Sequence, residues 1–242
     1  MPSLTVNNLT KTFKIGALKR QGVLANLISL ISGRETKKVF TALKNISFQT
    51  SAGEFLGLIG DNGAGKSTLL RCLAGIYPAD SGEIKTFGPV VSLIELNDGF
   101  KSRLSAKDNL FLCGALLGLT KKEIKERLDE IINFAELQNF VDTKIYQFSG
   151  GMVERLAFSL AIFAQPKILL LDELFNAVDL SFQAKALAKL KTMVQSGITI
   201  ILASHDLETI KTCCDKIIWL KAGTIFKIGQ PKEIIEPYQA QK

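Results

Sequence analysis

One short motif limits the fold of this chain more than any other feature. Residues Gly60 to Ser67 read Gly-Asp-Asn-Gly-Ala-Gly-Lys-Ser and fit the pattern G-x-x-x-x-G-K-[ST]. The apolar run Phe55–Ile59 precedes the motif, and the helical pattern Lys66–Ala74 follows it. Glycines let the backbone N–H groups face a phosphate chain, and the positive end of a helix adds to the attraction. We therefore expect a strand, a phosphate-binding loop and a helix, with Lys66 at the terminal phosphates and Ser67 on Mg²⁺.

Strand and helix patterns alternate along the rest of the chain, which indicates an α/β fold with helices on the faces of a sheet. Strands are expected at residues 4–9, 42–48, 55–59, 83–87, 90–94, 168–171, 198–202, 216–220 and 224–228, and helices at 66–74, 106–117 and 121–134. The last two strands flank Gly223 and predict a hairpin. From about residue 95 to 164 the pattern is helical, so we expect a helical subdomain inserted into a single domain, residues 1–242.

Two apolar strands end in residues suited to phosphate chemistry. Asp172 and Glu173 follow the run Ile168–Leu171, and His205, the one histidine of the chain, follows Ile198–Leu202. Ligands of open α/β sheets bind at the carboxyl ends of the strands. We expect Asp172 to hold Mg²⁺, Glu173 to polarise an attacking water, and His205 to contact the γ-phosphate or that water.

The formal charge of +7 lies in one segment. Between Lys11 and Lys44 the sequence has eight basic residues and one acid, whereas the other residues carry 22 of each sign. A charge spread over the whole fold would favour nucleic acid as a partner, but a local excess indicates a local partner. Nucleic acid is therefore not expected as a ligand.

Composition excludes several other classes of protein. With 47% hydrophobic and 22% charged residues, the chain has enough apolar surface to fold. The longest apolar stretch, Leu110–Leu119, is half of the about 20 residues that a membrane-spanning helix needs. Residues Met1–Thr10 do not have the pattern of a signal peptide. The four cysteines show no zinc-site spacing and are expected to be reduced thiols: Cys72, Cys113, Cys213 and Cys214.

The charged segment contains an insertion at about residues 14–41. Leu24, Leu27, Ile28 and Ile31 would fall on one face of a helix, with basic residues on both sides in the sequence. Such a helix can lie on an anionic membrane surface or contact a partner. The alternative is that the apolar residues of the insertion cover the domain's own core. The sequence of the insertion is equally compatible with both interpretations.

Further motifs resemble the nucleotide-binding subunits of ABC transporters over nearly the whole chain. Phe148-Ser149-Gly150-Gly151-Met152 is similar to the family signature LSGGQ, from which Phe148 and Met152 depart. Asn176-Ala177-Val178-Asp179 resembles the D-loop, with Leu174-Phe175 where Pro-Thr is common. Phosphate loop, signature, acidic pair and histidine follow one another in the family's order.

The resemblance implies a P-loop NTPase (RecA-like) core, an N-terminal antiparallel β subdomain and an inserted helical subdomain. It also implies two copies that bind head to tail around two ATP molecules, with catalysis by Glu173 and His205. Phe13 fits the aromatic residue that stacks on adenine, and Glu95, or alternatively Asn97, fits the Q-loop residue near Mg²⁺. The metal residues would be Ser67, Asp172 and Glu95. The residues implied to contact ATP are Phe13, Gly60, Asp61, Asn62, Gly63, Ala64, Gly65, Lys66, Ser67, Thr68, Ser149, Gly150, Gly151 and Asp179.

A narrower resemblance concerns exporters of O-antigen, capsule and teichoic acid. Leu93-Ile94-Glu95-Leu96-Asn97-Asp98-Gly99-Phe100 is similar to their LLELGAGF stretch. It implies an ATPase at the cytoplasmic face of the inner membrane that powers export of a lipid-linked polysaccharide through two permease subunits. No carbohydrate-binding domain is expected, because the chain ends shortly after the nucleotide-binding core. The alternatives are a drug or lipoprotein exporter, a soluble ABC-type ATPase acting on nucleic acid, and a non-catalytic binding module.

Overall fold

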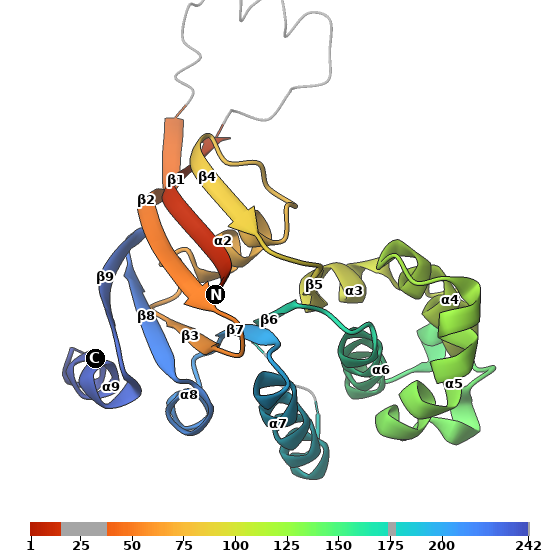
Figure 1. Ribbon diagram of the computed structural model, residues 1–242. Helices are drawn as coiled ribbons and strands as arrows, with labels where there is room; N and C mark the ends of the chain where they lie inside the picture. Colours follow the sequence, from red (N-terminus) through yellow and green to blue (C-terminus); the bar gives the residue numbers. More distant parts are fainter. Residues whose placement is uncertain (16–37, 174–177, 242) are drawn as a thin grey trace, which may run out of the picture.

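The described strands form two separate sheets, one smaller and one larger (Figure 1). The structure, a computed structural model, describes residues 1–15, 38–173 and 178–241. The smaller sheet is antiparallel, in the order β2-β1-β4, with β1 (Pro2–Ile15), β2 (Lys38–Ser51) and β4 (Ser81–Thr86). Leu4 and Val6 follow the alternation of a strand and are buried on one face, and an irregularity in the pairing after Val6 lets Leu9 reach the same core.

The larger sheet has six strands in the order β5-β6-β7-β3-β8-β9. Its strands are β3 (Phe55–Ile59), β5 (Val90–Ser92), β6 (Ile168–Asp172), β7 (Thr199–Ala203), β8 (Lys216–Lys221) and β9 (Thr224–Gly229). Neighbours are parallel except β9, which forms an antiparallel hairpin with β8. β3 and β7 are buried along their whole length, as expected of parallel strands covered on both faces.

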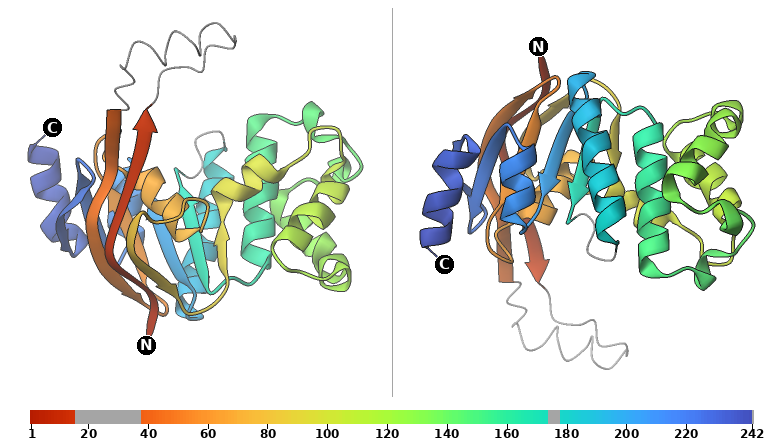
Figure 2. Two further views of the ribbon diagram at one scale, coloured as in Figure 1. Left: turned by 90° about the horizontal axis from the view of Figure 1, so that it is seen from above. Right: turned by 90° about the horizontal axis from the view of Figure 1, so that it is seen from below.

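Helices cover both faces of the larger sheet (Figure 2). Helix α2 (Lys66–Leu73) packs between the two sheets, in a core that includes Leu69, Leu70 and Leu43. The opposite face packs against a second core built from the other helices. These are α3 (Leu93–Gly99), α4 (Ala106–Leu116), α5 (Lys121–Ala135), α6 (Gly150–Phe163), α7 (Leu180–Gln195), α8 (Leu207–Cys213) and α9 (Pro231–Ala240), with short 3-10 turns at Gln138–Phe140 and Ile145–Gln147. Helices α4, α5 and α6 gather at one end of the molecule (Figure 1).

This architecture confirms the predicted α/β fold with an antiparallel β subdomain. In the stretch from 95 to 164, the described residues form helices and one isolated bridge, Ser105 to Lys144, but no strand. One prediction is wrong, because residues 90–94 are not a single strand. The chain turns into α3 at Leu93, since the i, i+3 pair Leu93 and Leu96 buries its side chains in the core beside α6.

The insertion lies mostly outside the described residues. Its proposed helix falls within 16–37, which the structure does not describe. The described ends continue the antiparallel ribbon, with Phe13 opposite Phe40 and Ile15 opposite Lys38. Among the helices that are described, none has the length and apolar character needed to cross a membrane.

Candidate active site

The glycine-rich loop runs from the end of β3 to the start of α2. Gly60 has φ of 149° and Gly65 has φ of 107°, and a Cβ on Gly60 would lie 2.3 Å from the carbonyl oxygen of Leu220. Only glycine fits such positions without displacing the neighbouring strand. Gly65 is the N-cap of α2 and has no side chain that could bond to the first turn. The first-turn N–H groups are therefore available to an anion.

Lys66 is buried beneath this loop. Its Nζ donates to the carbonyl oxygens of Gly60 at 2.7 Å and Asp61 at 3.3 Å, which fixes the ammonium group beside the curled backbone. A cavity of about 340 Å³ opens above the loop, and we call it the phosphate pocket. It is lined by Phe40, Ala42, Asn62, Gly63, Gly65, Lys66, Ser67, Thr68 and Glu173.

Two aromatic residues lie beside this pocket, and sequence reasoning identified only one. Phe13 packs edge-to-face on Tyr77, with ring centroids 5.4 Å apart, and does not line the cavity. Phe40, which is 50% exposed, does line it. Because Phe13 and Phe40 are directly opposed across antiparallel strands, their side chains leave the ribbon on the same face. Phe40 could have been identified only as the residue that pairs with Phe13 across the two strands. That pairing depends on the strand register, which local sequence patterns do not reveal.

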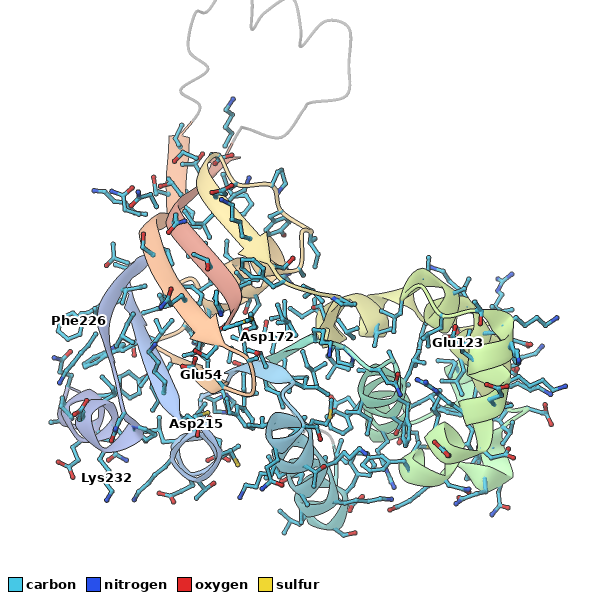
Figure 3. The ribbon with its side chains drawn as sticks, viewed as in Figure 1. Glu54, Glu123, Asp172, Asp215, Phe226 and Lys232 are labelled. Atoms are coloured by element: carbon cyan, nitrogen blue, oxygen red, sulfur yellow. The ribbon has the colours of Figure 1, made fainter. Side chains whose placement is uncertain are left out.

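Asp172 ends β6, where Figure 3 labels it. Burial raises the pKa of its carboxyl group, and a hydrogen bond with the Ser67 hydroxyl opposes this rise in pKa. The buried Oδ1 atom has no hydrogen-bond partner in the described part of the chain. A buried carboxylate oxygen beside a hydroxyl is a donor set that suits a hard cation such as Mg²⁺. Ser67 and Asp172 therefore fit the metal that the motif implies.

Glu173 and His205 meet at the mouth of the pocket. His205 Nδ1 lies 3.5 Å from Glu173 Oε1, and their side chains are 63% and 42% exposed. Glu173 has φ of 49°, a left-handed conformation that costs energy for a residue with a side chain. Its backbone N–H donates to the carbonyl oxygen of Ala203 at 2.9 Å, so the end of β7 holds this strained turn.

The residues of the signature lie on another part of the molecule. Ser149 is the N-cap of α6 and accepts a hydrogen bond from the N–H of Met152 at 3.2 Å. Ser149 and Gly150 are exposed, whereas Gly151 is buried. None of the three lines the phosphate pocket. One copy of the chain therefore does not bring the loop and the signature together.

The remaining predicted site residues are only partly described. Asp179 is the N-cap of α7, and its Oδ1 accepts from the N–H of Phe182 at 3.0 Å. Glu95 and Asn97 both lie on α3, but their side chains are outside the described part, so the choice between them stays open.

The chain matches the model of a protein family described as "ABC transporter" over residues 43–176, which is more than half of its length. The chain belongs to the ABC transporter family. Within that family it is 35% identical to an O-antigen export system ATP-binding protein of Klebsiella pneumoniae, over 98% of both chains. It is 39% identical to such a protein of Yersinia enterocolitica, over 94% of this chain and 98% of the relative. A teichoic acids export ATP-binding protein of Lactococcus lactis is 40% identical over 96% of this chain but only 49% of its own length.

Solved structures support the same fold for this ABC transporter chain. An ATP-binding cassette described as a dimer in a post-hydrolysis state, bound to ADP and phosphate, matches with a TM-score of 0.78 at 24% identity. The match covers 94% of this chain and 98% of that one. At this identity the likeness establishes the architecture of two sheets and helices.

Proposed function

We propose that this ABC transporter ATPase powers the export of a lipid-linked polysaccharide of the O-antigen type. The observation that carries the enzymatic part is the meeting of Ser67, Asp172 and Glu173 at the phosphate loop, with His205 beside Glu173. The names of the relatives support the exported substrate. The chain would act at the cytoplasmic face of the inner membrane, as one of two copies bound to two permease subunits.

Each residue of the site has a role that follows from its position. Lys66 and the N–H groups of the first turn of α2 bind and orient the phosphates of ATP. Ser67 and Asp172 would hold Mg²⁺, which neutralises phosphate charge when bound. Glu173 orients the water that attacks the γ-phosphate, and His205, whose Nδ1 lies 3.5 Å from Glu173 Oε1, holds the carboxylate in place. A second copy would close the site with Ser149, Gly150 and Gly151, which do not line the pocket of their own copy.

A groove at the opposite end of α2 from the phosphate loop offers a place for the permease. A cavity of about 650 Å³ lies between the end of α2 and helices α3 and α4. Its lining includes the exposed apolar side chains of Ile76 and Leu116, and Leu116 is 73% exposed. An apolar patch of this kind on a subunit of an export system fits a cytoplasmic loop of a membrane partner. Because α2 starts at the phosphate loop, movement there would reach this groove directly.

The enzymatic proposal is tested by Glu173→Gln. The amide keeps the shape of the side chain but cannot take up a proton from water, so turnover is expected to fall by about a hundredfold or more. ATP binding is expected to persist, because the phosphate loop is untouched, and the variant should accumulate as an ATP-bound dimer. Phosphate release, nucleotide binding by calorimetry and light scattering measure the three effects. Hydrolysis at the wild-type rate would contradict the role of Glu173.

The exported substrate requires a test in cells. Replacing the gene with the Glu173→Gln variant is expected to remove the polysaccharide from the cell surface and to accumulate its lipid-linked form inside. Normal surface polysaccharide, combined with loss of export of a drug or lipoprotein, would show that the substrate class is wrong while the ATPase assignment stands.

A further inference from the structure

Four charged side chains connect the helical end of the molecule to helix α7. Arg155 on α6 donates from Nη1 to Glu136 Oε2 at 3.0 Å, and its Nη2 lies 3.4 Å from Asp179 Oδ2. Lys185 on α7 donates from Nζ to Glu136 Oε1 at 2.9 Å. Acids and bases alternate through these contacts, which we call the Arg155 bridge (Glu136, Arg155, Asp179 and Lys185).

The bridge lies on an aromatic cluster and is not a set of free surface pairs. Phe182 packs edge-to-face on Phe134 and Phe158, with ring centroids 5.7 and 6.1 Å apart. The Arg155 guanidinium lies 5.6 Å from the centre of the Phe182 ring, and the Arg155 side chain is only 22% exposed. Arginine can contact two carboxylates at once and stack on a ring, which lysine cannot do equally well. The geometry therefore specifies arginine at this position.

The bridge links one predicted site residue, Asp179, to the helix that follows the signature. Arg155 lies on the helix that begins after Ser149, within two turns of the signature. Asp179 uses Oδ1 to cap α7 and presents Oδ2 to Arg155. Arg155 lowers the pKa of Asp179 as well, though less than the hydrogen bond from the N–H of Phe182 does. One carboxylate thus sets the start of α7 and its position relative to α6.

We propose that Arg155 is a positioning residue that fixes Asp179 to the signature helix α6. Asp179 and the signature would then contact the partner subunit in a fixed relative position. The inference rests on the proposed function, in which Ser149, Gly150 and Gly151 of one copy contact the nucleotide held by the other, and on the expected contact of Asp179 with ATP. Without the bridge, the phosphate pocket would still bind ATP, but the dimer would close with its signature and D-loop out of register. The bridge would therefore act on kcat and dimerisation and leave ATP affinity unchanged.

The test compares Arg155→Met with Lys189→Met in the full chain. Lys189, on α7, is a matched control because it is also a cation over an aromatic ring, 5.5 Å from the centre of Phe163. Arg155→Met is expected to lower kcat by about tenfold and to weaken the ATP-bound dimer of the Glu173→Gln protein similarly, with ATP affinity within about twofold. Arg155→Lys should recover part of the loss, and Lys189→Met should behave as wild type.

A double-mutant cycle shows whether Arg155 acts through Asp179. Asp179→Asn keeps an N-cap oxygen but loses the charge that Arg155 contacts. If the two residues act together, the double variant is no slower than the slower single variant. Full additivity of the two losses in kcat, or a wild-type kcat for Arg155→Met, would overturn the proposal.

Hydrogen exchange separates this inference from the proposed function. In the nucleotide-free protein, Arg155→Met is expected to speed exchange in residues 178–183, and Lys189→Met is not. Unchanged exchange there would overturn the positioning role even if the protein hydrolyses ATP. If the wild-type protein neither hydrolyses ATP nor dimerises while the exchange effect is present, the proposed function fails and the bridge stands as a link between helices.

Discussion

A carboxylate buried beside a phosphate loop destabilises the protein until a cation neutralises it, and Asp172 has this position. Its pKa is raised by burial, so the stability penalty is absent below the unfolded pKa and grows as pH rises through the folded pKa. We expect Asp172→Asn to raise the Tm of the nucleotide-free protein at pH 7 by about 2–4 °C. The gain should vanish below about pH 2.5, where the carboxyl group is protonated in both states.

The same variant should lose the stabilisation that Mg²⁺ and ATP give to the wild type, because a ligand stabilises only as strongly as it binds. Thermal melts with and without both ligands measure the two effects. A lower Tm for Asp172→Asn in the absence of nucleotide would contradict the electrostatic explanation.

We expect Phe40, which lines the phosphate pocket, to strengthen nucleotide binding by stacking on the base. Stacking of a base on an aromatic ring contributes about 1–3 kcal/mol. We expect Phe40→Ala to weaken ATP binding by about tenfold but to leave the binding of inorganic tripolyphosphate, which has no base, unchanged. Val39→Ala is the matched control, since Val39 is 57% exposed and points to the opposite face of the strand. Equal loss for ATP and tripolyphosphate would exclude a contact with the base.

At the scale of elements, a buried group of hydroxyls fixes the small sheet to the large one. Thr199 on β7 donates to the Ser3 hydroxyl at 2.7 Å, or to the carbonyl oxygen of Ser51 at 2.9 Å, and Ser3 shares a hydrogen bond of 2.9 Å with Thr50. Thr199→Val has the same shape but leaves these partners unsatisfied, so we expect a loss of about 1–3 kcal/mol in the free energy of unfolding. Urea unfolding measures it.

Thr224→Val is the control for this prediction, because its hydroxyl donates to Lys221 in an exposed turn. Water can replace that exposed bond, so the control should change stability by less than about 0.5 kcal/mol. Equal losses for the two variants would show that burial of the hydroxyl group is not the cause.

Element boundaries show where local sequence patterns are sufficient. The strand Phe55–Ile59 and the start of α2 at Lys66 were predicted correctly, because glycines punctuate both sides. Residues 90–94 were assigned to one strand because a short apolar run is compatible with a strand or a buried helix. The observed strand is only three residues long, and packing of Leu93 and Leu96 decides the rest.

At the scale of the whole molecule, the predictable part of the site is the part carried by contiguous motifs. Gly60–Ser67 and the pair Asp172-Glu173 lie at strand ends, where the sequence alone places them. Phe40 and the Arg155 bridge could not be predicted, because each depends on residues brought together by strand register or helix packing. The charged insertion at about residues 14–41 contains none of the contiguous motifs, yet its residue Phe40 lines the phosphate pocket.

The separation of the signature from the phosphate pocket means that two defective copies can repair one another. In a mixed pair of Lys66→Ala and Gly150→Asp subunits, one composite site carries both defects and the other carries neither. We expect each variant alone to be inactive, and an equal mixture to recover about a quarter of the wild-type rate, since half of the pairs are mixed and each has one intact site of two. Phosphate release from the mixture measures this, and a mixture as inactive as its components would contradict repair through a shared site.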